Sequence, residues 1–127
     1  MILAKLKFLF LVLGLYHEHQ RPDRDNYISV GNSNNVTKCP LTNINVRQWL
    51  SSATTDYHLG YDFCSIMHYS KYEGPCKFTP KQKVSCHIMT QDNVFNINEI
   101  GQRTGLSDLD IKVLNQRYPC GGSLCYT

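Results

Sequence analysis

Two short segments of the sequence contain side chains that could take part in metal or peptide chemistry. The first is Gly14-Leu15-Tyr16-His17-Glu18, and the second is Ser65-Ile66-Met67-His68-Tyr69. A neutral imidazole can bind a divalent metal ion, and a phenol can donate a hydrogen bond to a negative charge that develops during a reaction. Taken alone, a single loop histidine is typical of an exposed surface, because a metal site requires several converging ligands.

The other candidate residues have plain structural interpretations. Without a flanking pattern, Met67 would be a core side chain and Tyr69 a half-buried aromatic residue. The run Asp23-Arg24-Asp25 is typical of a solvated turn, and we assign it a structural role. Four further histidines show no ligand spacing and are interpreted as structural or exposed: His19, His58, His68 and His87.

The first segment, together with the stretch from Gln20 to Ile28, resembles the downstream part of the zinc signature of the astacin family. In that family a helix presents H-E-x-x-H, a glycine turns the chain, and a third histidine follows three residues later, with a glutamate directly after it. Gly14, His17 and Glu18 match these last three positions. The resemblance implies that His17 is the third zinc ligand and that Glu18 holds the mature N-terminus after propeptide removal.

Two later blocks are similar to the same family. Residues 65–69 resemble its Met-turn, which implies that Met67 forms a hydrophobic floor beneath the metal, and that Tyr69 is a further ligand that stabilises the transition state. The stretch from Ile100 to Cys120 resembles the closing helix and terminal cysteine. The implied fold class is α+β, the C-terminal lobe of an astacin-like metzincin catalytic domain, mostly irregular with a Met-turn and a C-terminal helix.

The upstream half of the zinc signature does not match. Counting back from Gly14 places the first two zinc histidines at Lys7 and Leu11 and the catalytic glutamate at Phe8. A catalytic zinc normally has three protein ligands and an open position for water. Zinc is therefore the cofactor implied by the family, but we expect this chain alone to be inactive. Phe8 cannot act as a general base, and a protonated Lys7 opposes metal binding.

The elements that must position these residues divide the chain into three parts. Residues 1–13 form an apolar opening that resembles a signal peptide, an unrelated start or a buried apolar helix, and Gly14 would end any helix. Residues 14–120 form the partial astacin-like peptidase domain, and 121–127 a tail. Residues 27–30 are a strand candidate.

Two helices and one irregular region are predicted further along. Residues 45–52 could form a short helix in which Trp49 anchors a core contact. Residues 53–98 show no sustained period, which predicts irregular structure pinned by disulfides. Ser107 and Asp110 resemble a capping box that begins a helix ending near Tyr118. Its core-facing residues would be Leu109, Val113 and Leu114.

Composition favours a secreted domain. The 127 residues are 42% apolar and 18% charged, as in a globular protein, and the net charge of +3 is scattered, which argues against nucleic acid as a partner. Six widely spaced cysteines indicate disulfides, although sequence does not choose their pairing. Asn35 begins a glycosylation sequon. The apolar opening is shorter than a transmembrane helix requires.

Two functional hypotheses follow. The favoured one is an incomplete record of a secreted zinc metalloendopeptidase, whose intact form would cleave a protein or peptide substrate that the sequence does not identify. The alternative is a non-catalytic, secreted, disulfide-rich binding protein. Its extra disulfides would compensate for the missing lobe, since each contributes about 2 to 4 kcal/mol.

Overall fold

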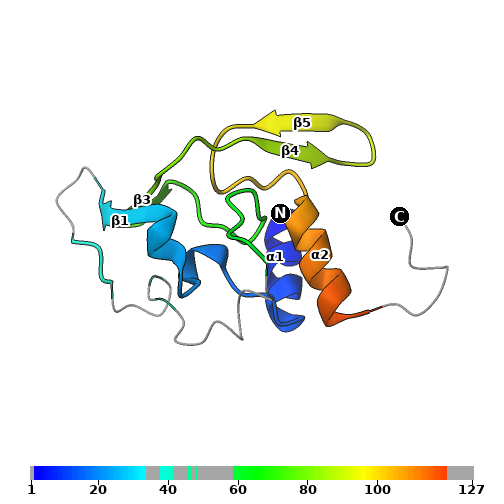
Figure 1. The fold of residues 1–127 in the computed structure, drawn as a ribbon, viewed down its shortest axis with the longest axis horizontal. Coiled ribbons are helices and arrows are strands. Elements are labelled where there is room, and N and C mark those ends of the chain that lie inside the picture. Colours follow the sequence, from blue (N-terminus) through cyan, green and yellow to red (C-terminus); the bar gives the residue numbers. More distant parts are fainter. Residues whose placement is uncertain (1, 34–37, 42–45, 47, 49–58, 120–127) are drawn as a thin grey trace.

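The protein is a mixed helix-and-sheet structure. A computed structural model describes residues 2–33, 38–41, 46, 48 and 59–119. Helices α1 (Ile2–Val12) and α2 (Asp108–Arg117) lie side by side, and a β-hairpin crosses above them (Figure 1). Two short 3-10 helices, η1 (Glu18–Gln20) and η2 (Arg24–Asn26), lead from α1 to the first strand. The predicted α+β class is confirmed at this level.

The strands form two small antiparallel sheets. In the first, β3 (Cys76–Pro80) lies between β1 (Ile28–Asn32) and β2 (Tyr72–Glu73). In the second, β4 (Cys86–Met89) pairs with β5 (Val94–Ile97) as a hairpin. The strand predicted at residues 27–30 is therefore present as β1, shifted by one residue at its start and two at its end.

The prediction of irregular structure over residues 53–98 is wrong for 72–97, which hold four strands. In β3 and β4, buried and less buried residues alternate as in a half-buried strand, but some of the buried positions are cysteines. In β3, Cys76 and Phe78 are buried, while Lys77 and Thr79 are not. In β4, Cys86 is buried on the inner face and His87 is exposed. Because these cysteines act as apolar core residues, the period of two is visible only when they are counted as such.

Disulfides connect these strands to the rest of the molecule. Cys39 is bonded to Cys76 of β3, and Cys64 is bonded to Cys86 of β4. The prediction that disulfides brace this region is confirmed. Several predictions fall wholly or mostly outside the described residues: the terminal cysteine Cys120 and the tail at 121–127, the glycosylation candidate Asn35, His58, and the helix at residues 45–52 with Trp49.

Helix α2 begins at the predicted capping box. The Ser107 hydroxyl accepts from the Asp110 N–H at 3.0 Å, and the Asp110 carboxylate accepts from the Ser107 N–H at 3.1 Å. Val113 and Leu114 pack against a small apolar core. That core consists of Phe10, Leu15, Ile66 and Met67. The predicted helix and most of its inward face are confirmed.

Helix α1 ends where Gly14 reverses the chain. Gly14 has a φ of +89°, which favours glycine, and a Cβ there would lie 2.4 Å from the Arg117 guanidinium. The Leu13 carbonyl accepts from Arg117 Nε at 2.8 Å and from the Tyr118 hydroxyl at 2.5 Å. These contacts join the last turn of α1 to the last turn of α2.

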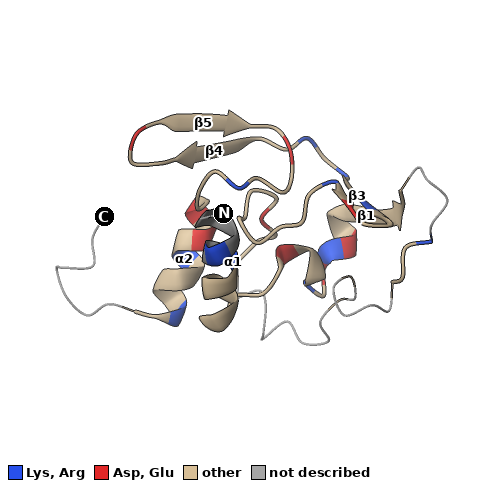
Figure 2. Cartoon of the chain, turned by 180° about the vertical axis from the view of Figure 1, so that it is seen from behind, with Lys and Arg blue, Asp and Glu red and all other residues tan. Residues whose placement is uncertain are grey.

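Basic and acidic residues are scattered along the described chain, as the colours of Figure 2 show, and residues 86–97 of the hairpin contain neither lysine nor arginine. In the part of the chain that the structure describes, no helix combines the length and apolar character needed to cross a membrane.

Candidate functional site

The segment Ser65–Tyr69 folds as a buried turn beneath the helices. The His68 N–H donates to the Ser65 carbonyl at 3.1 Å and closes the turn. The Ser65 hydroxyl accepts from the Met67 N–H at 3.0 Å. Met67 is 1% exposed and packs against the apolar core that α1 and α2 share. The turn is therefore fixed both by its own hydrogen bonds and by the helices above it.

Asp110 holds this turn from the first turn of α2. One carboxylate oxygen accepts from the Ser65 hydroxyl at 2.5 Å, and the other accepts from the Ile66 N–H at 2.9 Å and the Ser107 N–H at 3.1 Å. Burial raises the pKa of this carboxyl, although the hydrogen bonds oppose that shift. One side chain thus caps a helix and fixes the 65–69 turn.

Gln102 and Arg103 bind the same turn from its other side. Gln102 Nε2 donates to the Cys64 carbonyl at 2.7 Å and the Gly105 carbonyl at 2.8 Å. Arg103 Nη1 donates to the His68 carbonyl at 3.1 Å. These bonds satisfy carbonyl groups that would otherwise be buried without partners.

The His17 ring is held against the 65–69 turn by a hydrogen bond from Nδ1 to a backbone carbonyl. Nδ1 lies 2.9 Å from the Met67 carbonyl. Because a carbonyl only accepts, Nδ1 carries the proton and Nε2 keeps its lone pair. Burial lowers the pKa of His17, while the Met67 hydrogen bond acts in the opposite direction. The His17 ring is thus neutral and held at Nδ1, with Nε2 as its acceptor nitrogen.

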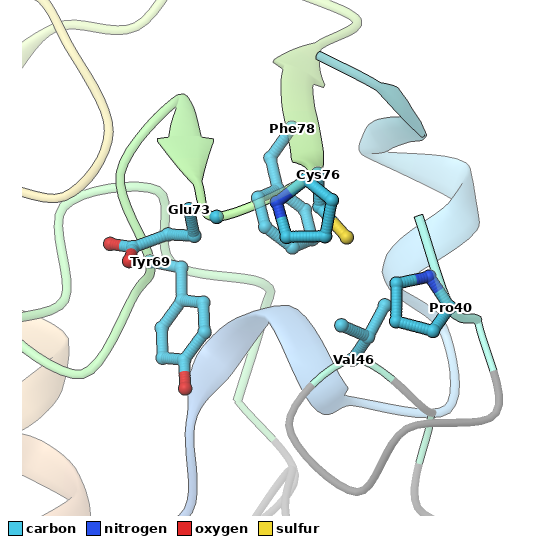
Figure 3. A pocket seen from close by; sticks show the side chains of 8 residues that line it. Pro40, Val46, Tyr69, Glu73, Cys76 and Phe78 are labelled. Atoms are coloured by element: carbon cyan, nitrogen blue, oxygen red, sulfur yellow. The ribbon is translucent and has the colours of Figure 1, made fainter. Parts of the chain in front are cut away.

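Tyr69 lies between two histidine rings and a cavity. Its ring stacks on His19 at 3.8 Å between centroids and meets His17 edge-on at 4.9 Å. Tyr69 and Glu73 line one side of a cavity of roughly 250 Å³, and Figure 3 shows Pro40 and Val46 on the other. Burial raises the pKa of the phenol, so Tyr69 stays protonated at neutral pH.

His68 is a structural histidine, as expected. It is fully buried, its Nδ1 donates to the Tyr69 carbonyl at 2.6 Å, and its Nε2 accepts from the Tyr61 hydroxyl at 2.7 Å. Burial lowers the pKa of His68 to about 4. The remaining histidines fit the same expectation where they are described, since His19 is buried and His87 exposed.

Glu18 points away from His17 and into a second polar cluster. Its carboxylate accepts from Arg21 Nη1 at 3.1 Å and from the Asp62 N–H at 2.8 Å. Burial raises the pKa of Glu18 to about 8, because the loss of hydration exceeds what Arg21 and the Asp62 N–H restore. The Ser107 hydroxyl donates to Asp62 at 2.5 Å and links this cluster to α2.

Helix α1 presents Lys7 to the site. The Lys7 ammonium lies over the Tyr69 ring at 5.6 Å from its centroid. Burial lowers the pKa of Lys7 to about 8, with Arg103 acting in the same direction and Glu73 against it. Two neighbours on α1 are exposed, Phe8 at 69% and Leu11 at 42%.

The structure thus brings His17, Met67 and Tyr69 together, as the sequence suggested, while the Glu18 carboxylate bonds to Arg21 and Asp62 instead. Sequence reasoning did not foresee the contacts of Gln102, Arg103 and Asp62. The Gly101-Gln102-Arg103 stretch lies within a block that is similar to the family, which is the available signal for two of these residues. No sequence pattern points to Asp62, because its contacts are with Glu18 and Ser107, which are distant in sequence.

Comparisons with known proteins show the family to which the chain is similar. The peptidase family described as Astacin matches residues 8–119. Nematocyst expressed protein 6 of Nematostella vectensis is 37% identical over 110 residues, which cover 85% of this chain and 34% of that protein. Meprin A subunit beta of Rattus norvegicus is 33% identical over 127 residues, covering 98% of this chain and 16% of that protein.

A third relative has a name that states its metal. Zinc metalloproteinase nas-14 of Caenorhabditis elegans is 33% identical over 113 residues, covering 89% of this chain and 20% of that protein. The chain therefore spans about a third or less of the length of these three relatives. Since the family matches nearly the whole chain, the protein belongs to the astacin family of metallopeptidases.

Proposed function

We propose that this chain supplies the part of an astacin-type zinc endopeptidase that carries the third metal ligand and the site tyrosine, and that it does not hydrolyse peptides by itself. One observation carries the proposal: His17 is oriented by the Met67 carbonyl and contacts Tyr69 directly after a helix that ends at a glycine turn. By resemblance, residues 65–69 are the Met-turn of a C-terminal lobe. Met67 is then its floor, and Tyr69 stabilises the transition state.

Helix α1 supports the second half of the proposal. Lys7, Phe8 and Leu11 stand where the family has H-E-x-x-H, and the Phe8 and Leu11 side chains are largely exposed hydrocarbon. A hydrocarbon side chain neither binds a metal nor accepts a proton. Peptide hydrolysis needs a polarised water and a base, so we expect none from these residues.

The residues also do not fit a zinc ion. In the described part of the chain, no three side chains of His, Cys, Asp or Glu come together as a metal-binding group. His17 and Tyr69 would contribute two donors at most, whereas catalytic zinc sites use three protein ligands. Zinc is the metal named for a relative, and its binding by this chain alone is not expected.

Glu18 supports the resemblance independently of the metal. By resemblance its carboxyl would accept the ammonium group of a mature N-terminus. A buried carboxyl with a pKa of about 8 fits that role, because a nearby ammonium would favour its ionised form and compensate for its lost hydration. Arg21 alone does not achieve this compensation.

Compartment and partners follow from the family and the disulfides. Two disulfides within the described residues indicate an oxidising compartment, and we propose that the protein is secreted. Its partner would be an extended protein or peptide segment, which could lie against Tyr69 and the cavity beside it.

The test is a peptidase assay on the oxidised full chain. The chain is incubated with fluorogenic peptides and zinc, with and without a chelator, beside the zinc metalloproteinase nas-14 relative as a positive control. We expect no chelator-sensitive cleavage by this chain. Cleavage that the chelator abolishes would overturn the proposal. Sequencing the transcript upstream of the Leu13–His17 codons then tests whether an in-frame H-E-x-x-H exists.

The alternative from the sequence, a non-catalytic binding protein, would depend on disulfides such as the two described here for its stability, since each contributes about 2 to 4 kcal/mol. Thermal unfolding without zinc separates the two candidates. A cooperative transition would favour the independent binding protein. A broad transition with early aggregation would favour a chain that needs the remainder of a peptidase domain.

A further inference from the structure

The positive charges of α1 are its most unusual feature. The helix contains two charged residues, Lys5 and Lys7, and no acidic residue. Lys5 is exposed, whereas Lys7 reaches back to the site and is partly buried. In Figure 2, α1 carries blue for its lysines, and the start of α2 is red for its acidic residues. The two lysines therefore differ in position relative to the site, although they share a helix and a charge.

Lys7 lies against the groups that remain of the proposed metal site. Its ammonium stands over the Tyr69 ring at 5.6 Å, and the edge of that ring contacts His17. A cation over an aromatic face is attracted by the ring, so the contact holds the ammonium in place. A fixed positive charge thus occupies the neighbourhood of the two candidate ligands.

The surrounding charges do not neutralise Lys7. Arg103 adds a second positive charge near it, and Glu73 is the carboxylate that acts on it. A divalent metal ion would bring two more positive charges into a partly buried space. At separations of a few ångströms, repulsion between such charges is large even at an effective dielectric constant of about 20. Metal binding is therefore opposed by repulsion as well as by missing ligands.

We infer that the Lys7 ammonium is the resident cation of this site, and that its charge keeps a divalent metal ion from binding to the adjacent His17 and Tyr69 side chains. The inference rests on the proposed assignment of His17 and Tyr69 as the remaining half of a metal site. The inference further implies that adding a third metal ligand beside His17 and Tyr69 would not by itself restore metal binding. The positive charge itself must be removed.

The experiment measures Zn²⁺ affinity by competition with a chromophoric chelator on oxidised full-length variants. Leu11→His restores one family ligand while Lys7 remains. Leu11→His with Lys7→Met has the same ligands, and Met keeps the unbranched shape of Lys without its charge. We expect the double variant to bind Zn²⁺ about 100-fold or more tightly than Leu11→His alone.

A matched control separates position from net charge. Leu11→His with Lys5→Met loses the same charge from an exposed position on the same helix. Its affinity is expected to stay within about threefold of Leu11→His, because solvent screens an exposed charge. If Lys5→Met and Lys7→Met raise the affinity equally, the inference is wrong. It is also wrong if neither substitution raises the affinity.

A second variant separates this inference from the proposed function. Leu11→His with Lys7→His supplies three histidines at the family positions. If this variant binds Zn²⁺ but Lys7→Met has no effect, only the inference about Lys7 fails. If this variant does not bind Zn²⁺ while circular dichroism matches the unmodified chain, the assignment of the site fails, and the inference fails with it.

Discussion

The 65–69 turn and helix α1 face the same site, but the chain holds them by different means. The turn is buried and bonded by the side chains of Asp110 and Arg103. Helix α1 is held through Phe10 and the contacts of its last turn, while four of its large apolar side chains are exposed. These exposed residues are Phe8, Leu9, Leu11 and Val12.

The difference shows that the scaffold of a site and its chemistry are separable. The hydrogen bonds that fix the turn come from α2 and from residues 102–103, whereas α1 contributes apolar packing against Met67 through Phe10. The first two metal ligands and the base of the family would all come from α1, and it carries none of them. The turn can therefore keep its geometry although α1 lacks the residues that would bind the metal and accept a proton.

Asp110→Ala should have the largest effect, because it removes the support of the turn and the cap of α2 together. The Ser65 hydroxyl, the Ile66 N–H and the Ser107 N–H would all lose their acceptor in a buried place. We expect the free energy of unfolding to fall by about 5 kcal/mol, measured in urea. Asp108→Ala, an exposed neighbour in the same turn, should cost less than about 1 kcal/mol. Equal losses for both variants would contradict this account.

Phe10→Ala tests how α1 is held. Phe10 is 6% exposed within the core shared with Met67, and its removal should lower the free energy of unfolding by about 4 kcal/mol. Phe8→Ala, two residues earlier and largely exposed, should change it by less than about 0.5 kcal/mol. The same denaturation measurement on both variants shows which face of α1 is packed. A larger fall in the free energy of unfolding for Phe8→Ala than for Phe10→Ala would mean that the face with Phe8 is the packed one.

His68→Gln tests how well the 65–69 turn is buried, through the pH dependence of the free energy of unfolding. The pKa of His68 is about 4 in the folded protein and 6.5 when unfolded, so the unfolded state takes up the proton first as pH falls. Stability from this histidine is thus present above about pH 6.5 and lost toward pH 4, a change on the order of 3 kcal/mol. Gln cannot titrate. Relative to this variant, the unmodified protein should lose that amount between about pH 7 and pH 4.

The comparison with His68→Gln has a built-in control. Glu18 and Asp62 also titrate in the acidic to neutral range, but both proteins contain them, and their contributions cancel in the difference. Parallel pH profiles for the two proteins would show that His68 is not shielded from protonation in the folded state.

Lys7→Met should affect stability less than Asp110→Ala, Phe10→Ala or His68→Gln. The substitution removes a contact with the Tyr69 ring and also removes the cost of partly burying an ammonium group, so the two changes oppose each other. We expect a change below about 1 kcal/mol in thermal or urea unfolding. A loss above about 2 kcal/mol would show that Lys7 stabilises α1 itself.

Local signals in the sequence predicted part of this structure. The capping box of Ser107 and Asp110 and the stop at Gly14 depend on residues close in sequence, and both are present. The proximity of His17 to Tyr69 was implied by family motifs, and the structure brings them into contact. Their roles in metal binding stay predictions.

Contacts between distant residues could not be predicted in this way. Asp110 bonds to Ser65 across 45 positions, and nothing near Asp110 in the sequence indicates a second function for a helix cap. The contact of Lys7 with Tyr69 has the same character. Strands β3 and β4 were missed for another reason, since their inner faces include disulfide cysteines that do not count as hydrophobic in a simple pattern.

The contact between Arg117 and the Leu13 carbonyl has a consequence for the dipoles of the two helices. Helices α1 and α2 run in the same direction, so their C-terminal ends meet, and both ends carry partial negative charge (Figure 1). Side by side, such parallel dipoles repel. Arg117 places one full positive charge at this meeting point and offsets both ends at once. Added salt should therefore weaken the pairing of these helices at their shared end.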